Sequence, residues 1–426
     1  MKNIFIKNTL ILIIGGLVTK IMGMLIKIIM TRNITTYALS LYMLTLPTYN
    51  LFITIVTLSL QISISKLVSE EEYDEDKILY NSLIISLIIS FISIFILLLI
   101  TKPITIVMHN KDLYYPLLSI ILSIPFISIS NSIRGYLFGK NKMFVQVISN
   151  FCEQIIRIII FITILPTIKN EIMMTTFIIG SNIINELLSI IIMSIFIPKR
   201  NIRNFKYDRN ISKKILKISI PTTLSRLLGV ISYFFEPIIL TNLLLINGYS
   251  NEYITTKYGI ITGYTLSLLM LPSFFTNAIS QTIIPLISKA FVNKNYLYIK
   301  NKIREVIILS LIIAISFISI IVLKKDFIMN FIYKTNKGIE YINILSPVFI
   351  LLYLEGPIIS ILQSLNKQNI TLIGTIIGII IKYISMIIFC LLKFGIYSFI
   401  ISMILNILFV VLFDFIYLKK TTNSFV

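Results

Sequence analysis

Residues 78–100 read ILYNSLIISLIISFISIFILLLI, a run of 23 residues without a single charged side chain. As an α-helix with a rise of about 1.5 Å per residue, this run is long enough to cross a hydrocarbon core of about 30 Å. The whole chain of 426 residues shares its character, because 57% of the side chains are hydrophobic and only 13% are charged. These values predict a membrane protein rather than a soluble domain.

Apolar runs of similar length recur along the whole chain. They predict an all-α polytopic membrane protein with about twelve transmembrane helices. The basic start of the chain would also suit a signal peptide, but no cleavage site follows and the apolar pattern continues to Met30, so we interpret it as the first helix. The predicted helices are residues 9–31, 39–65, 78–100, 113–136, 144–166, 171–197, 217–246, 258–287, 306–323, 341–365, 370–392 and 396–418.

The basic residues indicate the orientation of the chain. Most of the 38 Lys and Arg residues fall on the cytoplasmic side if the N-terminus is placed there, and residues 198–214 and 288–305 contribute most of that excess. The positive-inside rule then predicts that both termini are cytoplasmic. Orientation and attraction to anionic membrane lipids explain these basic loops, so we expect no nucleic-acid partner.

The long basic loop near residue 205 divides the predicted helices into six and six. We therefore expect two lobes, residues 1–205 and 206–426, in the same orientation and related by an axis along the membrane normal. Three sets of similar residues occupy equivalent positions in the two halves, each separated by 225 residues: Pro47 with Pro272, Asn141-Lys142 with Asn366-Lys367, and Arg157 with Lys382. The patterns Gly135 to Gly139 and Gly374 to Gly378 predict helix-packing faces.

Covalent chemistry has no candidate residues in this sequence. The phosphate-binding pattern GxxxxGK[ST] is absent, and His109 is the only histidine. A His-based catalytic triad or metal cluster is therefore excluded. We expect neither enzymatic activity nor a metal or other cofactor.

Ionisable residues at membrane depth are the main functional signal. Each costs roughly 2.5–3.5 kcal/mol on insertion scales, so such residues usually face a bundle interior or a wet cavity. Lys20 and Arg226 have no acid three or four positions away on their own helices, which predicts an anionic ligand such as pyrophosphate, although Lys27 can equally snorkel to the outer surface. The predicted substrate-binding residues are Lys20, Lys27, Arg226, Lys382, Asn50 and Gln61.

Acidic residues at membrane depth fall into two groups. Glu153 and Arg157 stand four positions apart on one helix, in the order that favours pairing, and predict a structural ion pair. Glu236 precedes Pro237, and Glu355 precedes a Gly-Pro pair. An acid beside a helix breaker predicts a hinge or an ion-coupling site for Na⁺ or H⁺.

Several segments resemble the stage V sporulation protein B family, a polysaccharide-exporter branch of the MOP flippase superfamily that is related to the MurJ lipid II flippases. The strongest are ISIPTTLSRLLGVISYFFEPIILTNLL at 218–244 and YGIITGYTLSLLMLPSFFTNAISQTIIPLISKA at 258–290, with LVTKIMGMLIKIIMTRNITTYALSLYMLTLPTYN at 17–50 and SIRGYLFGKNKMFVQVISNFCEQIIRI at 132–158. The resemblance implies two six-helix lobes around a central cavity in the bacterial cell membrane. It also implies that Lys20 and Lys27 hold a pyrophosphate.

Three functions remain open at this stage. The resemblance favours a flippase that moves a polyprenyl-pyrophosphate-linked saccharide from the inner to the outer leaflet by alternating access. A multidrug exporter of the MATE type, coupled to Na⁺ or H⁺, would use the same fold but favours an acidic cavity. A membrane scaffold without transport activity is the third alternative.

Overall fold

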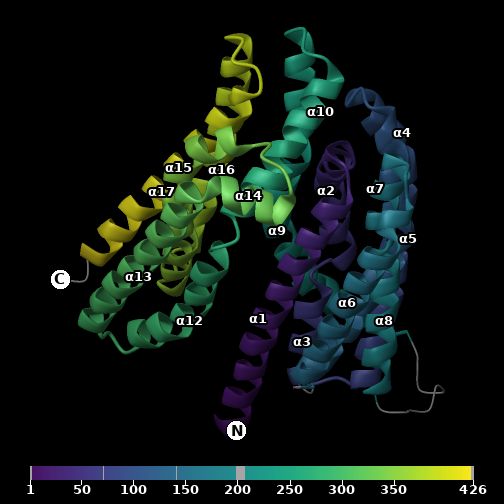
Figure 1. Cartoon of the computed structure of the whole chain (residues 1–426). Coiled ribbons are helices and arrows are strands. Elements are labelled where there is room, and N and C mark those ends of the chain that lie inside the picture. The colour runs from purple at the N-terminus through teal and green to yellow at the C-terminus, as the bar shows by residue number, and fades with distance from the viewer. Residues whose placement is uncertain (1, 71, 141, 198–206, 424–426) are drawn as a thin grey trace. The chain divides into compact units, whose positions relative to one another are not determined.

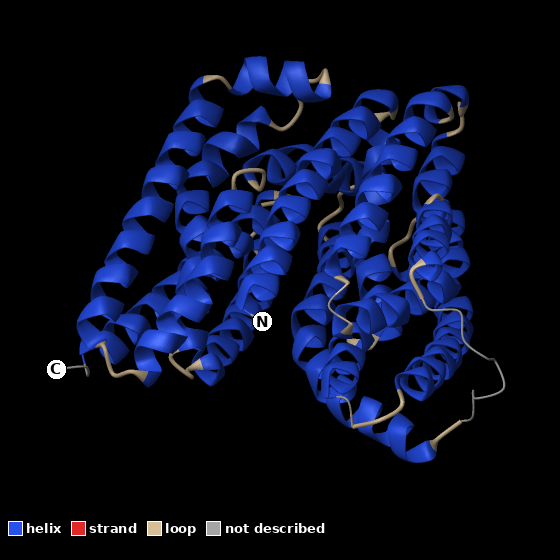
Figure 2. Cartoon of the chain, turned by 90° about the horizontal axis from the view of Figure 1, so that it is seen from below, coloured by secondary structure: helices blue, strands red, loops and turns tan. Residues whose placement is uncertain are grey.

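Helices form all the regular structure in the described residues of this computed structural model, and short loops join them (Figure 2). The structure describes the backbone of residues 2–70, 72–140, 142–197 and 207–423, and the side chains in these ranges except those of residues 2–14, 17, 225, 281 and 285. The predicted all-α fold is confirmed.

The helices follow the predicted transmembrane segments closely. Ten helical stretches of the described residues are long and apolar enough to cross a membrane, and a bent pair, Asn251–Leu269 with Ser273–Val292, makes an eleventh if counted as one span. The first predicted span lies within α1. The main helices are α1 (Lys2–Asn33), α2 (Thr36–Thr57), α3 (Leu60–Glu70), α4 (Glu75–Val107), α5 (Tyr114–Gly139), α6 (Met143–Thr163), α7 (Glu171–Gly180), α8 (Asn182–Ile195), α9 (Arg209–Ile246), α10 (Asn251–Gly259), α11 (Leu266–Leu269), α12 (Ser273–Val292), α13 (Tyr296–Leu323), α14 (Lys325–Tyr333), α15 (Ile339–Ser364), α16 (Gln368–Leu391) and α17 (Tyr397–Asn423).

Three predicted spans are broken rather than continuous. The span 39–65 separates into α2 and α3, because Leu58 and Ser59 adopt left-handed backbone conformations with φ of 41° and 49°. The span 171–197 separates into α7 and α8 at Ser181. The span 258–287 contains a π-helical turn at Ile260–Thr265 and then bends by 57° between α11 and α12. Periodicity alone did not predict these breaks.

The chain forms two compact units, Met1–Ile238 and Ile239–Val426. The chain passes from the first unit to the second within α9, after Ile238, which follows Pro237. The lobes predicted from the sequence, 1–205 and 206–426, place the boundary in the loop before α9 and stay a prediction.

In unit 1, α5 is the central helix and packs against α2, α3, α4, α7 and α8. Two glycines let α5 approach α3 closely, because a Cβ at Gly135 would lie 2.9 Å from the Cα atom of Gln61 and one at Gly139 would lie 3.0 Å from a backbone oxygen of α3. Serine pairs also join helices by hydrogen bonds. The hydroxyl oxygens of Ser86 on α4 and Ser132 on α5, for example, lie 2.6 Å apart. The predicted packing face on α5 is confirmed, and small residues determine how closely these helices pack.

In unit 2, α15 is the central helix and packs against α12, α13 and α17 (Figure 1). Its buried side chains Ile358 and Ile361 join Ile287 of α12 and Val411 of α17 in one hydrophobic core. The short amphipathic helix α14, which the sequence analysis did not predict, connects α13 to α15.

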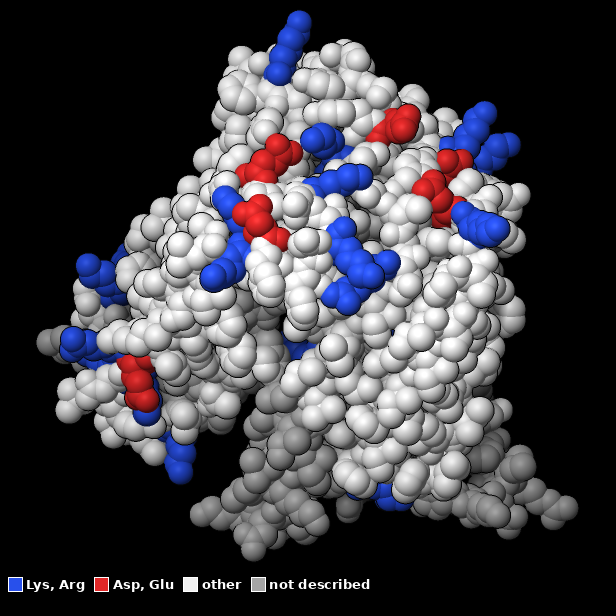
Figure 3. All heavy atoms as spheres, in the orientation of Figure 1, with Lys and Arg blue, Asp and Glu red and all other residues white. Residues whose placement is uncertain are grey.

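The surface of unit 1 fits a membrane environment. Large apolar side chains are exposed along its helices, among them Phe91 and Phe95 of α4 at 70% and 63%. On the face shown in Figure 3, the surface over α5 and α8 carries no Lys, Arg, Asp or Glu, whereas charged side chains gather above it. Such a broad apolar surface is stable in lipid and would aggregate in water.

Candidate functional site

Lys20 and Lys27, the two predicted binding residues of α1, form a stripe with Gly16 and Gly23 at spacings of four, three and four residues, which lie on one side of the helix. Another side of α1 packs against α6, where Gly15 is buried against Val147. On the stripe itself Lys20 is exposed and Lys27 half-buried, and a Cβ built at Gly23 would meet no atom within 4 Å. Lys20 therefore lies where a ligand can reach it, whereas Lys27, two turns further along the same side, is more enclosed.

The other predicted binding residues of the first 238 positions are dispersed over three helices. Arg226 is exposed on α9, Asn50 is exposed on α2, and Gln61 is half-buried on α3. Because α2 ends at Thr57 and α3 begins at Leu60, Asn50 and Gln61 do not share one continuous helix face. Among the described residues no hydrogen bond joins these three side chains.

Unit 1 contains a network of buried charges centred on Arg134 of α5. Its Nη2 atom lies 2.9 Å from Glu153 Oε1 on α6 and 3.6 Å from Glu186 Oε2 on α8, and it donates a hydrogen bond of 3.0 Å to Ser189. Ser130 also bonds to Glu186. Arg134 stands near the end of its predicted span, where a cation can snorkel, so its sequence position gave no signal of this role.

The structure gives Glu153 a different partner from the one expected. The sequence predicts an ion pair between Glu153 and Arg157, but the Glu153 carboxylate binds Arg134, and Arg157 donates a 2.7 Å hydrogen bond to Asn182 Oδ1. With its amide oxygen turned toward the guanidinium, Asn185 accepts two more hydrogen bonds at 2.9 and 2.8 Å. The expected pair is corrected, because the side chains that converge on each residue come from neighbouring helices rather than from α6.

Arg157 is thus a half-buried cation held by neutral groups. Tyr42 and Tyr49 of α2 also lie within its electrostatic reach. Among the described residues no carboxylate lies within ion-pair distance of Arg157. A guanidinium fixed by two amides keeps its full positive charge for an anionic partner.

Glu236 is buried on α9 beside Pro237, at the end of unit 1. Tyr233, one turn earlier, lies within electrostatic reach of Glu236 and of Tyr42. The position fits the predicted hinge or ion-coupling role, which stays a prediction.

In unit 2, Glu355 lies on α15 and interacts electrostatically with Asp414 of α17. Asp414 is fully buried, and neither of its carboxylate oxygens has a hydrogen-bond partner among the described residues. The sequence analysis did not select Asp414, because it lies only four residues from the end of the predicted span 396–418. A second acid on an adjacent helix becomes visible only in three dimensions.

Lys382 is half-buried on α16, on the same stripe as Gly374 and Gly378. The two glycines are buried against α17, since a Cβ at Gly374 would lie 2.8 Å from the ring of Phe413. This confirms the predicted packing face on α16. α17 therefore covers Gly374 and Gly378, whereas no atom lies within 4 Å of a Cβ built at Gly23 on α1.

Outside the predicted membrane segments, the start of α9 is held to the turn between α3 and α4. Lys214 binds Glu72 at 3.2 Å and lies 4.4 Å from the centre of the Tyr73 ring. Tyr73 and Glu72 raise the pKa of Lys214 above its ordinary value. Ser212 donates a 2.9 Å hydrogen bond to Asn81 of α4. These contacts attach the start of α9 to unit 1.

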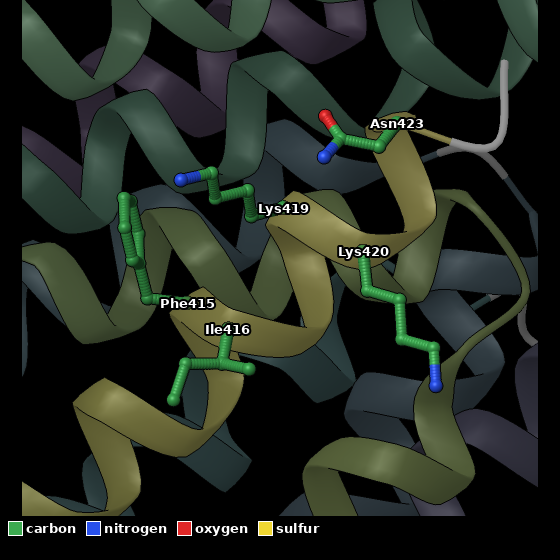
Figure 4. A pocket seen from close by; sticks show the side chains of 5 residues that line it. All are labelled: Phe415, Ile416, Lys419, Lys420 and Asn423. Carbon is green, nitrogen blue, oxygen red and sulfur yellow. The ribbon is translucent and has the colours of Figure 1, made fainter. Parts of the chain in front are cut away.

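Two further features do not contribute to a site. The described residues contain no group of three or more His, Cys, Asp or Glu that could hold a metal ion. A shallow pocket near the end of α17 is lined by Phe415, Ile416, Lys419, Lys420 and Asn423, and none of these residues was predicted to bind substrate (Figure 4). Its lysines are exposed at a helix end, where cations are usual.

Comparison with known proteins identifies the family. A family model described as polysaccharide biosynthesis protein matches residues 5–291, more than half of the chain. The chain belongs to the polysaccharide biosynthesis protein family. Stage V sporulation protein B of Bacillus subtilis strain 168 is 30% identical to it over 398 residues, which is 89% of this chain and 77% of that protein. Lipid II flippase MurJ of the same organism is 23% identical over 419 residues, 90% of this chain and 77% of that protein.

The fold of this polysaccharide biosynthesis family member also occurs in solved structures. The inward-facing conformation of a multidrug resistance MATE family transporter of the MOP superfamily aligns with a TM-score of 0.74, covering 96% of this chain and 95% of that one. At 16% identity this similarity shows the fold alone. The family member is thus a multi-pass membrane protein with the fold of a MATE family transporter, and one of its relatives is named as a flippase.

Proposed function

We propose that this protein is a membrane transporter that flips a polyprenyl-pyrophosphate-linked saccharide from the inner to the outer leaflet of the bacterial cell membrane. The observation that carries the proposal is its relationship, over about nine tenths of the chain, to a protein named as a lipid II flippase and to a sporulation protein of the same family. The substrate is a lipid II-like precursor of the cell wall or of another polysaccharide. Both termini lie in the cytoplasm.

The cations at membrane depth support an anionic head group. Lys20 is exposed on the open side of α1, and Arg226 is exposed on α9. Arg157 adds a third cation, which neutral amides hold in place. Charge-assisted hydrogen bonds to phosphate oxygens are stronger than neutral ones, and a guanidinium matches a phosphate bidentately. We assign the pyrophosphate to Lys20, Lys27, Arg226 and Lys382, with Asn50 and Gln61 as neutral donors.

Alternating access is the proposed mechanism. The two lobes move as bodies about a central cavity, with Glu236 and Pro237 at a hinge in α9. The driving force is the membrane potential or an ion gradient of Na⁺ or H⁺. Moving one charge through the potential is worth about 2.3 kcal/mol per 100 mV, so even one uncompensated charge on the substrate or the protein supplies useful work.

The direct test is transfer of a labelled lipid-linked precursor in proteoliposomes. We expect the double substitution Lys20→Ala with Arg226→Ala to abolish transfer while the protein keeps its unfolding temperature. Lys169→Ala with Lys300→Ala is the matched control, because it removes two exposed cations outside the predicted site and should transfer normally. Full transfer by the Lys20 and Arg226 variant would reject the site assignment. A scaffold protein instead predicts that this variant complements a null strain normally.

A multidrug exporter of the MATE type is the second candidate, favoured by the TM-score of 0.74 to such a transporter. It predicts that expression raises resistance to cationic dyes and that Glu236 or Glu355 is required. We favour the flippase because the accessible charges on α1 and α9 are cations, which repel a cationic drug. Dye resistance that is lost in Glu236→Gln, together with absence of precursor transfer, would reverse this preference.

A further inference from the structure

The short helix α14 carries large apolar side chains on two sides. On the first side Met329 is fully buried, and Tyr333 is 4% exposed with its ring 5.2 Å from that of Tyr264 in the π-helical turn. On the second side Phe327 and Phe331 are 67% and 65% exposed. Packing within unit 2 therefore accounts for the first side of α14 but not for the two exposed aromatic side chains.

Phe327 and Phe331 form one apolar patch on α14. They stand four positions apart, about one helical turn, and their rings stack with centroids 5.8 Å apart and planes 9° apart. The residues just before α14 have the same character, because Ile320 and Leu323 at the end of α13 are 55% and 80% exposed. α13 is one of the helices that can cross a membrane, so its exposed apolar side chains face lipid. The patch thus follows directly on a lipid-facing helix.

α14 itself is too short to cross the membrane. Its nine residues correspond to about 14 Å at a rise of roughly 1.5 Å per residue, less than half of a hydrocarbon core of about 30 Å. In Figure 1, α14 does not continue the direction of α13 but turns aside and lies crosswise to it. A helix that starts where a membrane span ends and then turns aside lies at the membrane surface, with protein on one side and lipid on the other.

Lysines stand at both ends of the patch. Lys324 and Lys325 precede it, and Lys334 follows it and ends the helix with a left-handed backbone at φ of 54°, while α14 contains one acid, Asp326. Lys324 and Lys334 are exposed, and Lys325 donates a 2.8 Å hydrogen bond to Asn343 of α15. An interfacial lysine lays its apolar stem on hydrocarbon and extends its ammonium group toward the head groups. Cations at both ends of exposed aromatic rings therefore complement the phosphates that lie above the acyl chains of a phospholipid layer.

We propose that α14 is an interfacial helix that binds the phospholipid surface, with Phe327 and Phe331 inserted among the upper acyl chains and Lys324 and Lys334 at the level of the phosphates. Helices with an apolar side and cationic flanks lie in the plane of the interface in this way. Lipid also removes from water an aromatic patch that no described residue covers. The leaflet is the outer one if both termini are cytoplasmic, a clause that rests on the proposed function.

The position of α14 in the chain gives this contact a consequence. α14 connects α13 to α15, the central helix of unit 2, and packs against both. An α14 held at the interface therefore fixes the end of α13 and the start of α15 at the level of the lipid head groups. In the proposed transport cycle unit 2 then moves about a fixed depth in the membrane.

Tryptophan fluorescence tests the contact with lipid. The chain contains no Trp, so Phe331→Trp introduces a single fluorophore into the full-length protein. The variant is placed in phosphatidylcholine vesicles whose acyl chains carry bromine either near the head group or near the chain end. We expect strong quenching by the shallow bromines, several-fold weaker quenching by the deep ones, and little quenching by aqueous iodide.

Three further single-tryptophan variants calibrate the measurement. Phe91→Trp, at a side chain that is 70% exposed in the middle of α4, should respond most to the deep bromines. Asn336→Trp, in the exposed loop after α14, should respond to iodide. Tyr333→Trp, on the buried side of α14, should be shielded from both quenchers. Unfolding temperatures close to that of the wild type confirm that each variant is folded.

Three results with Phe331→Trp would overturn the proposal. Quenching by iodide without quenching by bromine would place the patch in water. Absence of quenching by either would show that protein covers it, either another part of this chain or a second copy. A bromine profile equal to that of Phe91→Trp would place the side chain in the hydrocarbon core instead of at the interface. The measurement needs no lipid-linked substrate, so its outcome does not depend on the proposed flippase activity.

A transfer assay in proteoliposomes tests the consequence for transport. Phe327→Gln with Phe331→Gln removes the apolar patch, whereas Phe327→Leu with Phe331→Leu keeps it and is the matched control. Both double variants change only exposed side chains and should unfold at the wild-type temperature. We expect the Gln variant to transfer the labelled precursor several-fold more slowly and the Leu variant to transfer it at the wild-type rate. Equal rates in the two variants would reject the role of α14 in transport, and absence of transfer by the wild type would refute the proposed function without changing the fluorescence result.

Discussion

Replacing Arg134 by Met gives the most direct test of how charge is stabilised inside unit 1. The change keeps most of the side-chain volume but leaves Glu153 and Glu186 without their shared cation. The side chains of Arg134, Glu153 and Glu186 are only 17%, 11% and 18% exposed, so water cannot replace the lost partner. Removing one member of a buried ion pair costs about 3–5 kcal/mol, and we expect Arg134→Met to lie in that range.

The assay is unfolding of the purified protein in detergent, followed by a double-mutant cycle. The triple variant Arg134→Met, Glu153→Gln, Glu186→Gln should recover most of the lost stability, because no uncompensated charge remains. Arg157→Met should cost less than Arg134→Met, since it removes hydrogen bonds to neutral amides rather than an ion-pair partner.

The cycle also separates the two possible partners of Glu153. The coupling energy between Glu153 and Arg134 should exceed about 1 kcal/mol, and that between Glu153 and Arg157 should fall below about 0.5 kcal/mol. The reasoning is refuted if Arg134→Met costs less than about 1 kcal/mol, or if Glu153 couples more strongly to Arg157 than to Arg134.

Two further predictions concern packing and an exposed contact. Gly135→Leu should separate α5 from α3 and lower the unfolding temperature by several degrees, because even a Cβ would lie 2.9 Å from the α3 backbone; an unchanged unfolding temperature would contradict the close approach. Lys214→Gln removes a lysine whose pKa is raised by Tyr73 and Glu72, so its stabilising contribution is present below the ordinary lysine pKa and is lost as the pH rises through the raised value. The wild type and this variant should therefore differ slightly in unfolding temperature at neutral pH and become equal in strongly alkaline buffer; a difference that grows with pH would contradict this sign.

Much of the secondary structure could be predicted from hydrophobicity alone. The span predicted at 341–365 is α15, Ile339–Ser364, and that predicted at 370–392 is α16, Gln368–Leu391. Agreement within a few residues follows from a simple physical cause, because a helix in lipid must be predominantly apolar along its length and polar residues gather at its ends. The break at Leu58 could not be predicted, since two left-handed residues leave no mark on an apolar run.

The candidate site was predictable only in part. Helical periodicity places Lys20 and Lys27 on one side of α1, and in the structure Lys20 is exposed there. The partners of the buried charges did not follow, because Arg134 and Glu153 are 19 residues apart and meet only when α5 packs against α6. The spacing of residues along the sequence predicts which side chains are neighbours on one helix. It does not predict contacts between side chains of different helices.

The sequence by itself determined the class of this protein, the positions of its helices and the presence of charges at membrane depth. These properties depend on composition and on the period of a single helix, which are local. The tertiary structure decided which groups surround each charge: two acids lie beside Arg134, two amides bind Arg157, and no donor among the described residues reaches Asp414. Electrostatic energy depends on distance in space, so only the packing of helices against one another could separate a structural ion pair from a candidate functional site.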